Sequence, residues 1–404
     1  MHKQLDNKVK KVIVVNSSDF TRSSAVTSRI KAYCKGLMSN GVDVEIVGGY
    51  IVTSSNDDAE LPIKGETNGI QYQYVQRRKA GYGVIKGCFY KISFLFKTIV
   101  TIGKINHKTR IDYAFLSMDT SLFLWFYTFV FGLFRIKTIL IADEYPVAIR
   151  DQGKSDISTK ERRSLQAVWR FIYGRVFINE KLVEYYNNIR TTDRVMVLPT
   201  IIDTDRFQNI IIGNSNKYLC YVGGMDLSND NVDLIIKAFA KISDKYPEIE
   251  LHLYGKPKAN DKARLENIIK DCHLENKVFL KGYIGYYEVP RIMANACIMV
   301  TSQSKTKRAE GGLPTKAGEY LMSGVPSILS DVSTISQFLI HKKHVFIVPP
   351  DDINLYADTI EYVLNNYDVA KSVAQVGRQY VENNYSYSVQ GKRLVDFLNS
   401  VKVY

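Results

Sequence analysis

Short runs of β-branched residues alternate with longer helical patterns along almost the whole chain. The series starts with a predicted strand at Lys11–Asn16, a helix at Ala25–Ser39 and a strand at Val42–Val47. Strands that are separated by helices indicate a parallel, doubly wound sheet. The first series then continues with predicted strands at Tyr113–Leu116, Thr138–Ile141, Arg175–Ile178 and Val195–Leu198.

A second series starts at Tyr218–Val222 and predicts a second Rossmann-like sheet. Between the two series lies Ile201–Asn216, which becomes polar toward its end and is interpreted as the linker. We therefore predict a first domain over residues 1–206, a second over residues 207–385, and a C-terminal helix in residues 386–404 that could cross back onto the first. The other segments of the second series are Val232–Lys245, Glu250–Tyr254, Lys262–Cys272, Val278–Lys281, Val289–Ala296, Cys297–Thr301, Lys316–Ser323, Ser327–Ser330, His344–Val348 and Asn354–Asn365.

The composition excludes disordered and collagen-like chains, because 46% of the 404 residues are hydrophobic and only 24% are charged. Five scattered cysteines without a Cys-x-x-Cys spacing favour reduced thiols in a cytoplasmic protein over a disulfide scaffold or a zinc site. The six histidines show no ligand spacing either. A site without metal is therefore the expectation.

Positive charge is concentrated in the first half of the chain. Residues 1–206 carry 31 basic and 20 acidic residues, and Thr67 to Ile111 contains nine basic residues and no acidic one. Aromatic and aliphatic residues interleave with these charges, a composition that suits a helix on an anionic membrane leaflet. A solvated basic face with a core-facing apolar stripe explains the pattern equally well, and nucleic-acid binding is a weaker alternative because no nucleic-acid motif accompanies it.

The longest apolar stretch, Leu122 to Phe134, has about 13 residues, whereas a bilayer-spanning helix needs about 20. This stretch therefore predicts a buried core helix or an interfacial segment.

The most specific motif is EGGLPTKAGEYLMSGVPSILSD, from Glu310 to Asp331. Gly311, Gly312, Leu313 and Pro314 precede a helix predicted to start near Thr315, so free backbone N–H groups and the positive end of the helix would face a ligand there. A diphosphate is the natural occupant of such a site. Lys316 adds a positive charge in the first turn, and Glu319, three residues later, shares its face.

Together with VMVLPTIIDTDRF (Val195–Phe207) and YVGGMDLSNDNVDLIIKAFA (Tyr221–Ala240), this motif resembles the retaining family 4 of glycosyltransferases, the glycosyl transferases group 1. The resemblance implies the GT-B fold, in which two Rossmann-like domains face a central cleft. It also implies transfer of a sugar from a nucleoside diphosphate sugar, a UDP- or GDP-sugar, to a glycan or lipid-linked glycan in cell-surface polysaccharide synthesis. Such an enzyme would work in the cytoplasm, peripherally on the inner face of the membrane.

The resemblance also implies roles for single residues. Glu319 matches the glutamate that binds the donor ribose, whereas Glu310 lies one residue away from the position of the family's first glutamate. Either Glu310 replaces that glutamate through a one-residue bulge, or the backbone amides of Gly311–Leu313 bind the sugar alone. In the Gly223–Gly224 segment the family's two phosphate-binding cations are absent, because their positions hold Gly224 and Asp230. The cations that could substitute for them are Lys316, Lys305, Lys307, Arg308 and Arg22.

In the first domain, Asp143 or Glu144 is expected to orient the donor sugar or the acceptor hydroxyl, or else to start a helix. In the second, Gly255, Lys256 and Tyr283 are expected near the nucleobase, although Tyr283 could simply pack in the core. Two other functions stay open. One is a different GT-B enzyme, such as a nucleotide-sugar epimerase or an inverting transferase, and the other is a non-catalytic scaffold that has lost diphosphate binding.

Overall fold

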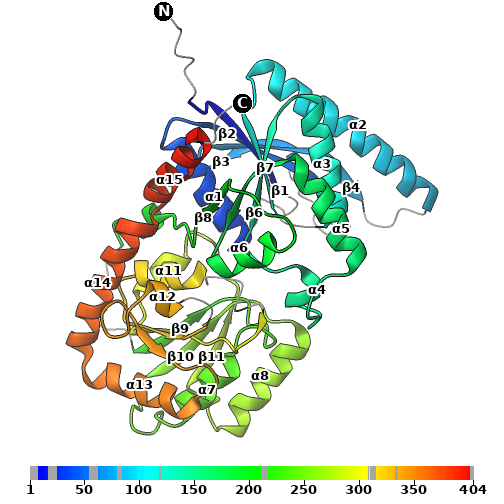
Figure 1. Ribbon diagram of the computed structural model, residues 1–404. Coiled ribbons are helices and arrows are strands. Elements are labelled where there is room, and N and C mark those ends of the chain that lie inside the picture. The colour runs from blue at the N-terminus through cyan, green and yellow to red at the C-terminus, as the bar shows by residue number, and fades with distance from the viewer. Residues whose placement is uncertain are drawn as a thin grey trace, which may run out of the picture. The chain divides into compact units, whose positions relative to one another are not determined.

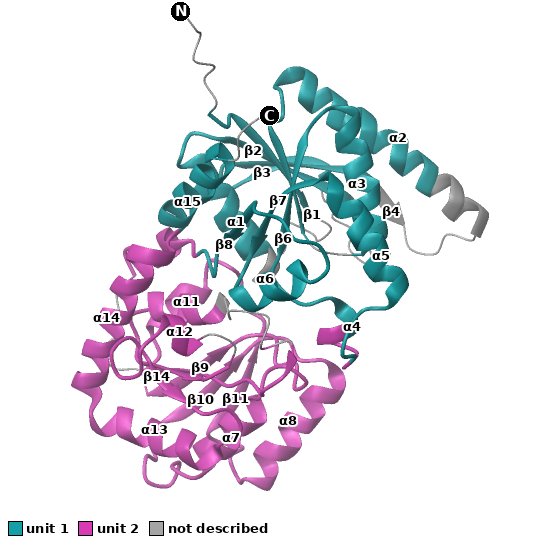
Figure 2. Ribbon diagram, in the orientation of Figure 1, with its two compact units in different colours: residues 1–148, 154–201, 387–404 teal, residues 149–153, 202–386 magenta. Residues whose placement is uncertain are grey.

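The structure is a computed structural model that describes residues 8–16, 25–53, 62–79, 84–117, 120–210, 217–307, 309, 315–332 and 335–400. The chain folds into two compact units (Figure 2). Unit 1 contains residues 1–148, 154–201 and 387–404, and unit 2 contains residues 149–153 and 202–386. Each unit is built around its own sheet.

Unit 1 contains an eight-stranded sheet with the order β3-β4-β2-β1-β5-β6-β7-β8. Its neighbouring strands pair in parallel except β3, which pairs with β4 in the antiparallel direction. The predicted parallel sheet is confirmed, and the antiparallel edge is a feature that the sequence analysis did not anticipate. The strands are β1 Lys11–Asn16, β2 Asp43–Thr53, β3 Lys64–Thr67, β4 Ile70–Lys79, β5 Tyr113–Ser117, β6 Lys137–Ala142, β7 Ile172–Phe177 and β8 Val195–Val197.

Helices cover both faces of this sheet (Figure 1). Helices α1 and α15 pack on one face, where strand residues such as Val12, Val44 and Phe115 are fully or almost fully buried. Helices α2, α3 and α5 lie on the opposite face. The bounds are α1 Ala25–Met38, α2 Val84–Lys108, α3 Ser121–Leu133, α4 Val147–Arg150, α5 Thr159–Val168, η1 Trp169–Phe171, α6 Glu180–Asn187 and α15 Tyr387–Ser400.

The composition of the basic segment Thr67–Ile111 suggested a helix, but the segment does not form a single helix. Its first part is strand β4, because Ile70, Tyr72 and Tyr74 alternate with polar residues and bury their side chains in the α1–α15 layer. Only residues 84–108 form a helix, α2. The prediction of a helix on a membrane surface therefore concerns only residues 84–108, and it stays a prediction.

The C-terminal helix α15 contacts α1 within unit 1 at a pair of glycines. A Cβ atom added to Gly391 would lie 2.3 Å from the carbonyl oxygen of Gly36. No side chain fits at this distance, so the two helix backbones touch directly. The sequence analysis did not anticipate the preceding helix, α14 (Tyr367–Tyr385), which ends just before α15.

Unit 2 contains a six-stranded sheet with the order β11-β10-β9-β12-β13-β14, and its neighbouring strands all pair in parallel. The second predicted Rossmann-like sheet is thus confirmed. Its core is formed by side chains of the strands with those of α7, α8 and α13. The bounds are η2 Thr204–Phe207, β9 Tyr218–Val222, α7 Val232–Ala240, β10 Glu250–Tyr254, α8 Ala259–Asp271, β11 Val278–Gly282, α9 Val289–Ala294, β12 Ile298–Thr301, α11 Thr315–Met322, β13 Ser327–Ser330, α12 Ile335–Phe338, β14 Phe346–Val348 and α13 Ile353–Asn365.

Among the described residues, no helix combines the length and the apolar character that crossing a membrane requires.

Candidate functional site

The carboxyl ends of three neighbouring strands of unit 2 meet at glycines. The Gly223 N–H after β9 donates to Tyr254 O at 3.0 Å, and the Gly255 N–H after β10 donates to Gly282 O at 2.8 Å. Gly255 has a φ of +151°, and a Cβ there would lie 1.8 Å from Gly223 O. Position 255 therefore requires glycine. Because glycines stand at the carboxyl ends of β9, β10 and β11, backbone groups rather than side chains lie at this edge of the sheet.

Lys316, in the first turn of α11, lies directly over the end of β9. Its Nζ is 2.6 Å from Asp230 Oδ1 and donates to the Tyr221 hydroxyl at 3.0 Å. A Cβ added to Gly223 would lie only 2.5 Å from this Nζ. Gly223 thus makes room for the ammonium group at the edge where α/β sheets bind ligands.

Asp230 opposes the charge of Lys316. Asp230 is buried, and it lies at the position where the family resemblance leads one to expect a cation. Burial, and next the Asp230 carboxylate, raise the pKa of Tyr221 well above its usual value, so Tyr221 stays neutral. The positive charge of Lys316 is therefore partly neutralised within the protein itself.

Tyr320 fixes α11 to strand β9. Its hydroxyl accepts from Val222 N at 2.9 Å and donates to Val222 O at 3.2 Å, so it continues the backbone hydrogen bonding at the strand end. Burial raises the pKa of Tyr320 well above its usual value, which keeps the hydroxyl protonated. The sequence analysis noted Tyr320 only as part of the motif and missed this positioning role.

Glu319, one turn after Lys316, forms an ion pair with Arg206 of η2, with Oε1 and Nη1 separated by 2.5 Å. Arg206 also donates to Tyr286 O at 2.8 Å, and its guanidinium lies 3.7 Å from the centre of the Tyr286 ring. The Arg206 side chain is only 7% exposed. The sequence analysis missed Arg206, although it was the only basic residue in the quoted segment Val195–Phe207.

The other predicted donor residues of unit 2 lie at or near the same strand ends. Gly224 is exposed, and a Cβ there would meet only Asp230 Oδ2, at 3.8 Å. Lys256 is exposed after β10. Tyr283 follows β11 and is 62% exposed, so the alternative that it packs in the core is wrong.

Several predicted residues lie outside the described residues. They are Arg22, Arg308, Glu310, Gly311, Gly312, Leu313 and Pro314, together with the side chain of Thr315. Two further members of the basic cluster, Lys305 and Lys307, are described and exposed. The roles assigned to all of these residues stay predictions.

In unit 1, Asp143 directly follows strand β6 and is paired with the buried Arg29 of α1. Arg29 Nη2 lies 3.0 Å from Asp143 Oδ1 and donates to the Tyr33 hydroxyl at 3.0 Å. Burial acts to lower the pKa of Arg29, but Asp143 and Tyr33 outweigh it and the net shift is upward. The next helix begins only at Val147, so the alternative of a helix-start role for Asp143 and Glu144 is wrong.

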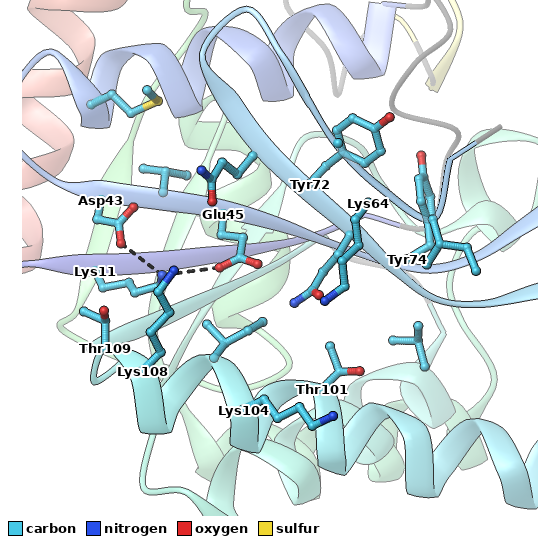
Figure 3. Close-up of a pocket in the computed structure, with 18 of the residues that line it drawn as sticks. Lys11, Asp43, Glu45, Lys64, Tyr72, Tyr74, Thr101, Lys104, Lys108 and Thr109 are labelled. Atoms are coloured by element: carbon cyan, nitrogen blue, oxygen red, sulfur yellow. Dashed lines mark hydrogen bonds and ion pairs between the residues drawn. The ribbon is translucent and has the colours of Figure 1, made fainter.

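Unit 1 also contains a separate polar pocket of about 880 Å³ beside α2 (Figure 3). Lys11 lies in it and bridges Asp43 and Glu45, at 2.9 and 3.3 Å. Lys104 and Lys108 reach it from α2. Lys11, Asp43 and Glu45 lie at the amino-terminal ends of β1 and β2, so this pocket is not at the strand ends where a nucleotide is expected.

Within the described parts of the chain, no three His, Cys, Asp or Glu residues are grouped closely enough to hold a metal ion. The sequence does contain one pair of aspartates separated by a single residue, Asp203 and Asp205, beside Arg206 in unit 2.

Comparison with known proteins gives one family match and several matches of fold. Residues 202–380 match the family model described as glycosyl transferases group 1. The poly(ribitol-phosphate) alpha-N-acetylglucosaminyltransferase of Staphylococcus aureus (strain COL) is 26% identical over 170 residues, which are 42% of this chain and 33% of that protein. The match thus spans about a third of the length of this curated relative.

Three solved structures illustrate the likeness of fold. Sucrose-phosphate synthase from Thermosynechococcus elongatus has a TM-score of 0.73 at 15% identity, covering 96% of this chain and 98% of that one. TarM has a TM-score of 0.72 at 13% identity, covering 98% and 100%. HepE of Anabaena in complex with UDP and glucose has a TM-score of 0.71 at 12% identity, covering 97% and 100%. Through residues 202–380 the chain is thus similar to the glycosyl transferases group 1, and its two parallel-sheet units have the GT-B fold of the matched structures.

Proposed function

We propose that the protein is a retaining glycosyltransferase that moves a sugar from a nucleoside diphosphate sugar to a glycan or lipid-linked glycan of the cell surface. The observation that carries this proposal is the arrangement at the end of β9. A lysine in the first turn of α11 lies over glycine backbone at the carboxyl ends of the strands, and a glutamate lies one turn further on. This combination suits a diphosphate followed by a ribose.

Lys316 and the N–H groups at the start of α11 would stabilise the negative charge that develops on the departing diphosphate. Such stabilisation costs little reorganisation, because Tyr320 already holds the helix against β9. Glu319 would accept hydrogen bonds from the ribose hydroxyls. Its pairing with Arg206 limits its rotation, so Arg206 would act as a positioning residue for the donor.

A UDP-sugar is the donor that we favour over a GDP-sugar. HepE has been solved in complex with UDP-glucose, and a TarM variant of S. aureus has been solved with alpha-GlcNAc-glycerol and UDP. The curated relative acts, by its name, on poly(ribitol-phosphate). These relatives support a polyhydroxylated surface polymer as the acceptor, and the basic first half of the chain suits an anionic one.

We also propose that transfer takes place in the cytoplasm at the inner face of the membrane, and that it needs no metal. A metal-independent enzyme keeps its full rate in EDTA. Loss of the rate in EDTA and its recovery with Mg²⁺ or Mn²⁺ would contradict this part of the proposal and would direct attention to Asp203 and Asp205.

The test of donor binding is the melting temperature of the purified chain with UDP, GDP, ADP, CMP and their sugar conjugates, because a ligand of the native state stabilises it. We expect UDP at a hundred times its Kd to add about 2.7 kcal/mol of stability. Lys316→Gln and Glu319→Gln should remove this response. The matched control is Glu361→Gln, whose carboxylate pairs with Lys245 on the surface of unit 2.

Product analysis then separates the alternatives. Proton NMR of the product shows its anomeric configuration. Retention of the configuration of the donor sugar supports the proposal, whereas inversion would contradict the retaining assignment. Conversion of the donor without any acceptor would indicate an epimerase. A protein that responds to none of these nucleotides, with or without vesicles and acceptor, would be a scaffold.

A further inference from the structure

The outer face of helix α3 is entirely apolar. The helix contains no charged residue, and Leu122, Phe129 and Leu133 are exposed to 78, 57 and 53%. Besides Trp125 and the buried Tyr127, its polar side chains are Ser121, which donates to Glu161, and Thr128, which donates to Leu124 O. A solvent-facing helix normally carries charges on its outer side, so this face is built for a different environment.

Helix α2 carries a second apolar stripe. Ile92, Phe96 and Val100 follow one another at a spacing of four residues and are exposed to 51, 63 and 52%. Thr98 and Ile102, on the opposite side of the helix, are completely buried. Ile92 and Phe96 therefore point away from the sheet, and Val100 lies at the rim of the polar pocket beside α2.

The two faces adjoin each other. Helices α2 and α3 cover the same face of the unit 1 sheet (Figure 1), and the rings of Phe94 and Phe126 stack between them at 5.5 Å. At the other side of α3, Trp125 contacts Phe171, which is 60% exposed. We call the combined area the outer apolar surface, and its members are Ile92, Phe96, Val100, Leu122, Trp125, Phe129, Leu133 and Phe171.

Positive charges border this surface, and neither α2 nor α3 carries an acidic residue. Lys97, Lys104 and Lys108 recur at intervals of seven and four residues, so they form a row along α2 beside the apolar stripe. Lys91, in α2, and Arg135, two residues after the end of α3, are also exposed. Within the described residues, no acidic side chain forms an ion pair with any of these five cations.

The charge pattern decides between the possible occupants. A second copy of the chain, docked by a twofold axis on this surface, would bring the lysine rows of both copies together and repel itself. An anionic bilayer offers acyl chains to the apolar side chains and phosphates to the lysines. Trp125 suits the boundary, because its ring is apolar and its Nε1 donates to Ser164 Oγ at 3.2 Å.

We infer that the outer apolar surface inserts into the headgroup–acyl boundary of an anionic bilayer, with α2 and α3 parallel to the membrane plane and the lysine row on the lipid phosphates. The inference deepens the proposed membrane location and rests on it, but it does not depend on sugar transfer. It differs from purely electrostatic adsorption, because the apolar part of the binding resists salt.

The test is co-sedimentation of the full chain with vesicles of phosphatidylcholine containing 30% phosphatidylglycerol. We expect binding at least tenfold tighter than to pure phosphatidylcholine in 0.1 M NaCl, and residual binding to the anionic vesicles in 0.5 M NaCl. Absent binding, or binding that high salt abolishes completely, would overturn the inference. Because the readout uses neither donor nor acceptor, it stays informative even when the transferase proposal fails.

Tryptophan fluorescence reports the depth of insertion. The chain has two tryptophans, and Trp169 is buried, so Trp125 should give the vesicle-induced blue shift and the quenching by brominated lipids. Trp125→Phe should remove both signals while the protein still sediments with the vesicles. A blue shift that persists in this variant would place the contact elsewhere and contradict the inference.

Variants separate the apolar contribution to vesicle binding from the electrostatic one. Leu122→Gln with Phe129→Gln should weaken binding at least tenfold in either salt concentration, whereas Val369→Gln with Val376→Gln, on exposed positions of α14, should not. Lys97→Gln with Lys104→Gln should weaken binding about fivefold in 0.1 M NaCl and little in 0.5 M, against Lys241→Gln with Lys270→Gln as the control.

Circular dichroism and the nucleotide response should be unchanged in all these variants, which shows that they fold. Vesicle binding by the Leu122/Phe129 variant equal to that of the wild type would refute the assigned surface. A concentration-dependent dimer that the same variant dissociates would show that a second copy covers it instead.

Discussion

Lys316 shows how closely a single charge can be held by its neighbours. Asp230 and Tyr221 bind its Nζ, and the missing side chain at Gly223 leaves room for it. An ammonium group with an ionised partner binds a phosphate less strongly than a free one, because the carboxylate repels the incoming anion. The affinity for a diphosphate should therefore depend on residues that do not touch it.

We predict that Gly223→Ala weakens the binding of UDP at least tenfold, or by about 1.4 kcal/mol. The new Cβ would lie 2.5 Å from Lys316 Nζ and 2.3 Å from the Tyr221 hydroxyl, so one of them must move. Gly224→Ala is the matched control, because its Cβ would meet only Asp230 Oδ2 at 3.8 Å. Isothermal titration measures both affinities, and equal losses in the two variants would contradict the assigned geometry.

Asp230→Asn should have the opposite effect and tighten UDP binding several-fold, since Lys316 loses the carboxylate that competes with the diphosphate. The same change should lower stability, because a half-buried ammonium loses its partner. Asp233→Asn, on the first turn of α7, removes an acid that pairs with Lys237 and Arg264 instead and should leave UDP binding unchanged. Weaker UDP binding by Asp230→Asn would show that Asp230 orients Lys316 rather than restrains it.

At the scale of elements, small residues and hydrogen bonds hold the helices in place. Tyr320 ties α11 to β9, and Gly36 and Gly391 let α1 and α15 touch within unit 1. Helix α15 therefore depends on a contact with a segment more than 300 residues away in the sequence. Such contacts have no local signature, because a glycine inside a helix ordinarily only weakens it.

Gly391→Ala should destabilise the protein by about 2 kcal/mol, as overpacking of a tight contact does. The new Cβ would lie 2.3 Å from a backbone oxygen, which cannot rotate away. Gly132→Ala, in α3, is the control: its Cβ would meet nothing within 4 Å, so the better helix propensity should stabilise by about 0.5 kcal/mol. Urea unfolding of both variants checks the opposite signs, and equal effects would refute the close approach of α1 and α15.

At the scale of the whole molecule, alkali should unfold the protein through its buried tyrosines. Burial raises the pKa of Tyr33 to about 12. It also raises the pKa values of Tyr221, Tyr320 and Tyr356 well above the usual value of a tyrosine. In the unfolded chain these groups lose their protons near pH 10. The unfolded state then binds fewer protons than the native one, so the free energy of unfolding falls as the pH rises above about 10.

The expected result is a urea midpoint that is constant from pH 8 to 9 and falls steeply beyond pH 10. Absorbance at 295 nm measures the ionisation of the buried tyrosines, which should coincide with the loss of circular dichroism. Full ionisation of all 27 tyrosines while the native circular dichroism persists would contradict the burial of these hydroxyls.

The sequence by itself determined the two parallel sheets, since alternating strands and helices have few other stable arrangements. It also indicated Lys316 and Glu319 as candidate donor-binding residues, because a glycine-rich loop, a helix start and two charges are adjacent in the motif. Only the tertiary structure decided that Asp230 and Tyr221 hold Lys316, that Arg206 pairs with Glu319, and that Tyr320 fixes α11. These partners lie 86 to 113 positions away from the residues they contact.

The same division applies to unit 1. Composition showed that α3 is apolar and that α2 is both apolar and basic, but it could not show which of their side chains face the sheet. Only the packing of both helices on one face of the sheet decided that Phe96, Leu122 and Phe129 remain exposed. The physical reason is that hydrophobic periodicity gives the face of a helix, whereas tertiary contacts decide whether that face is covered.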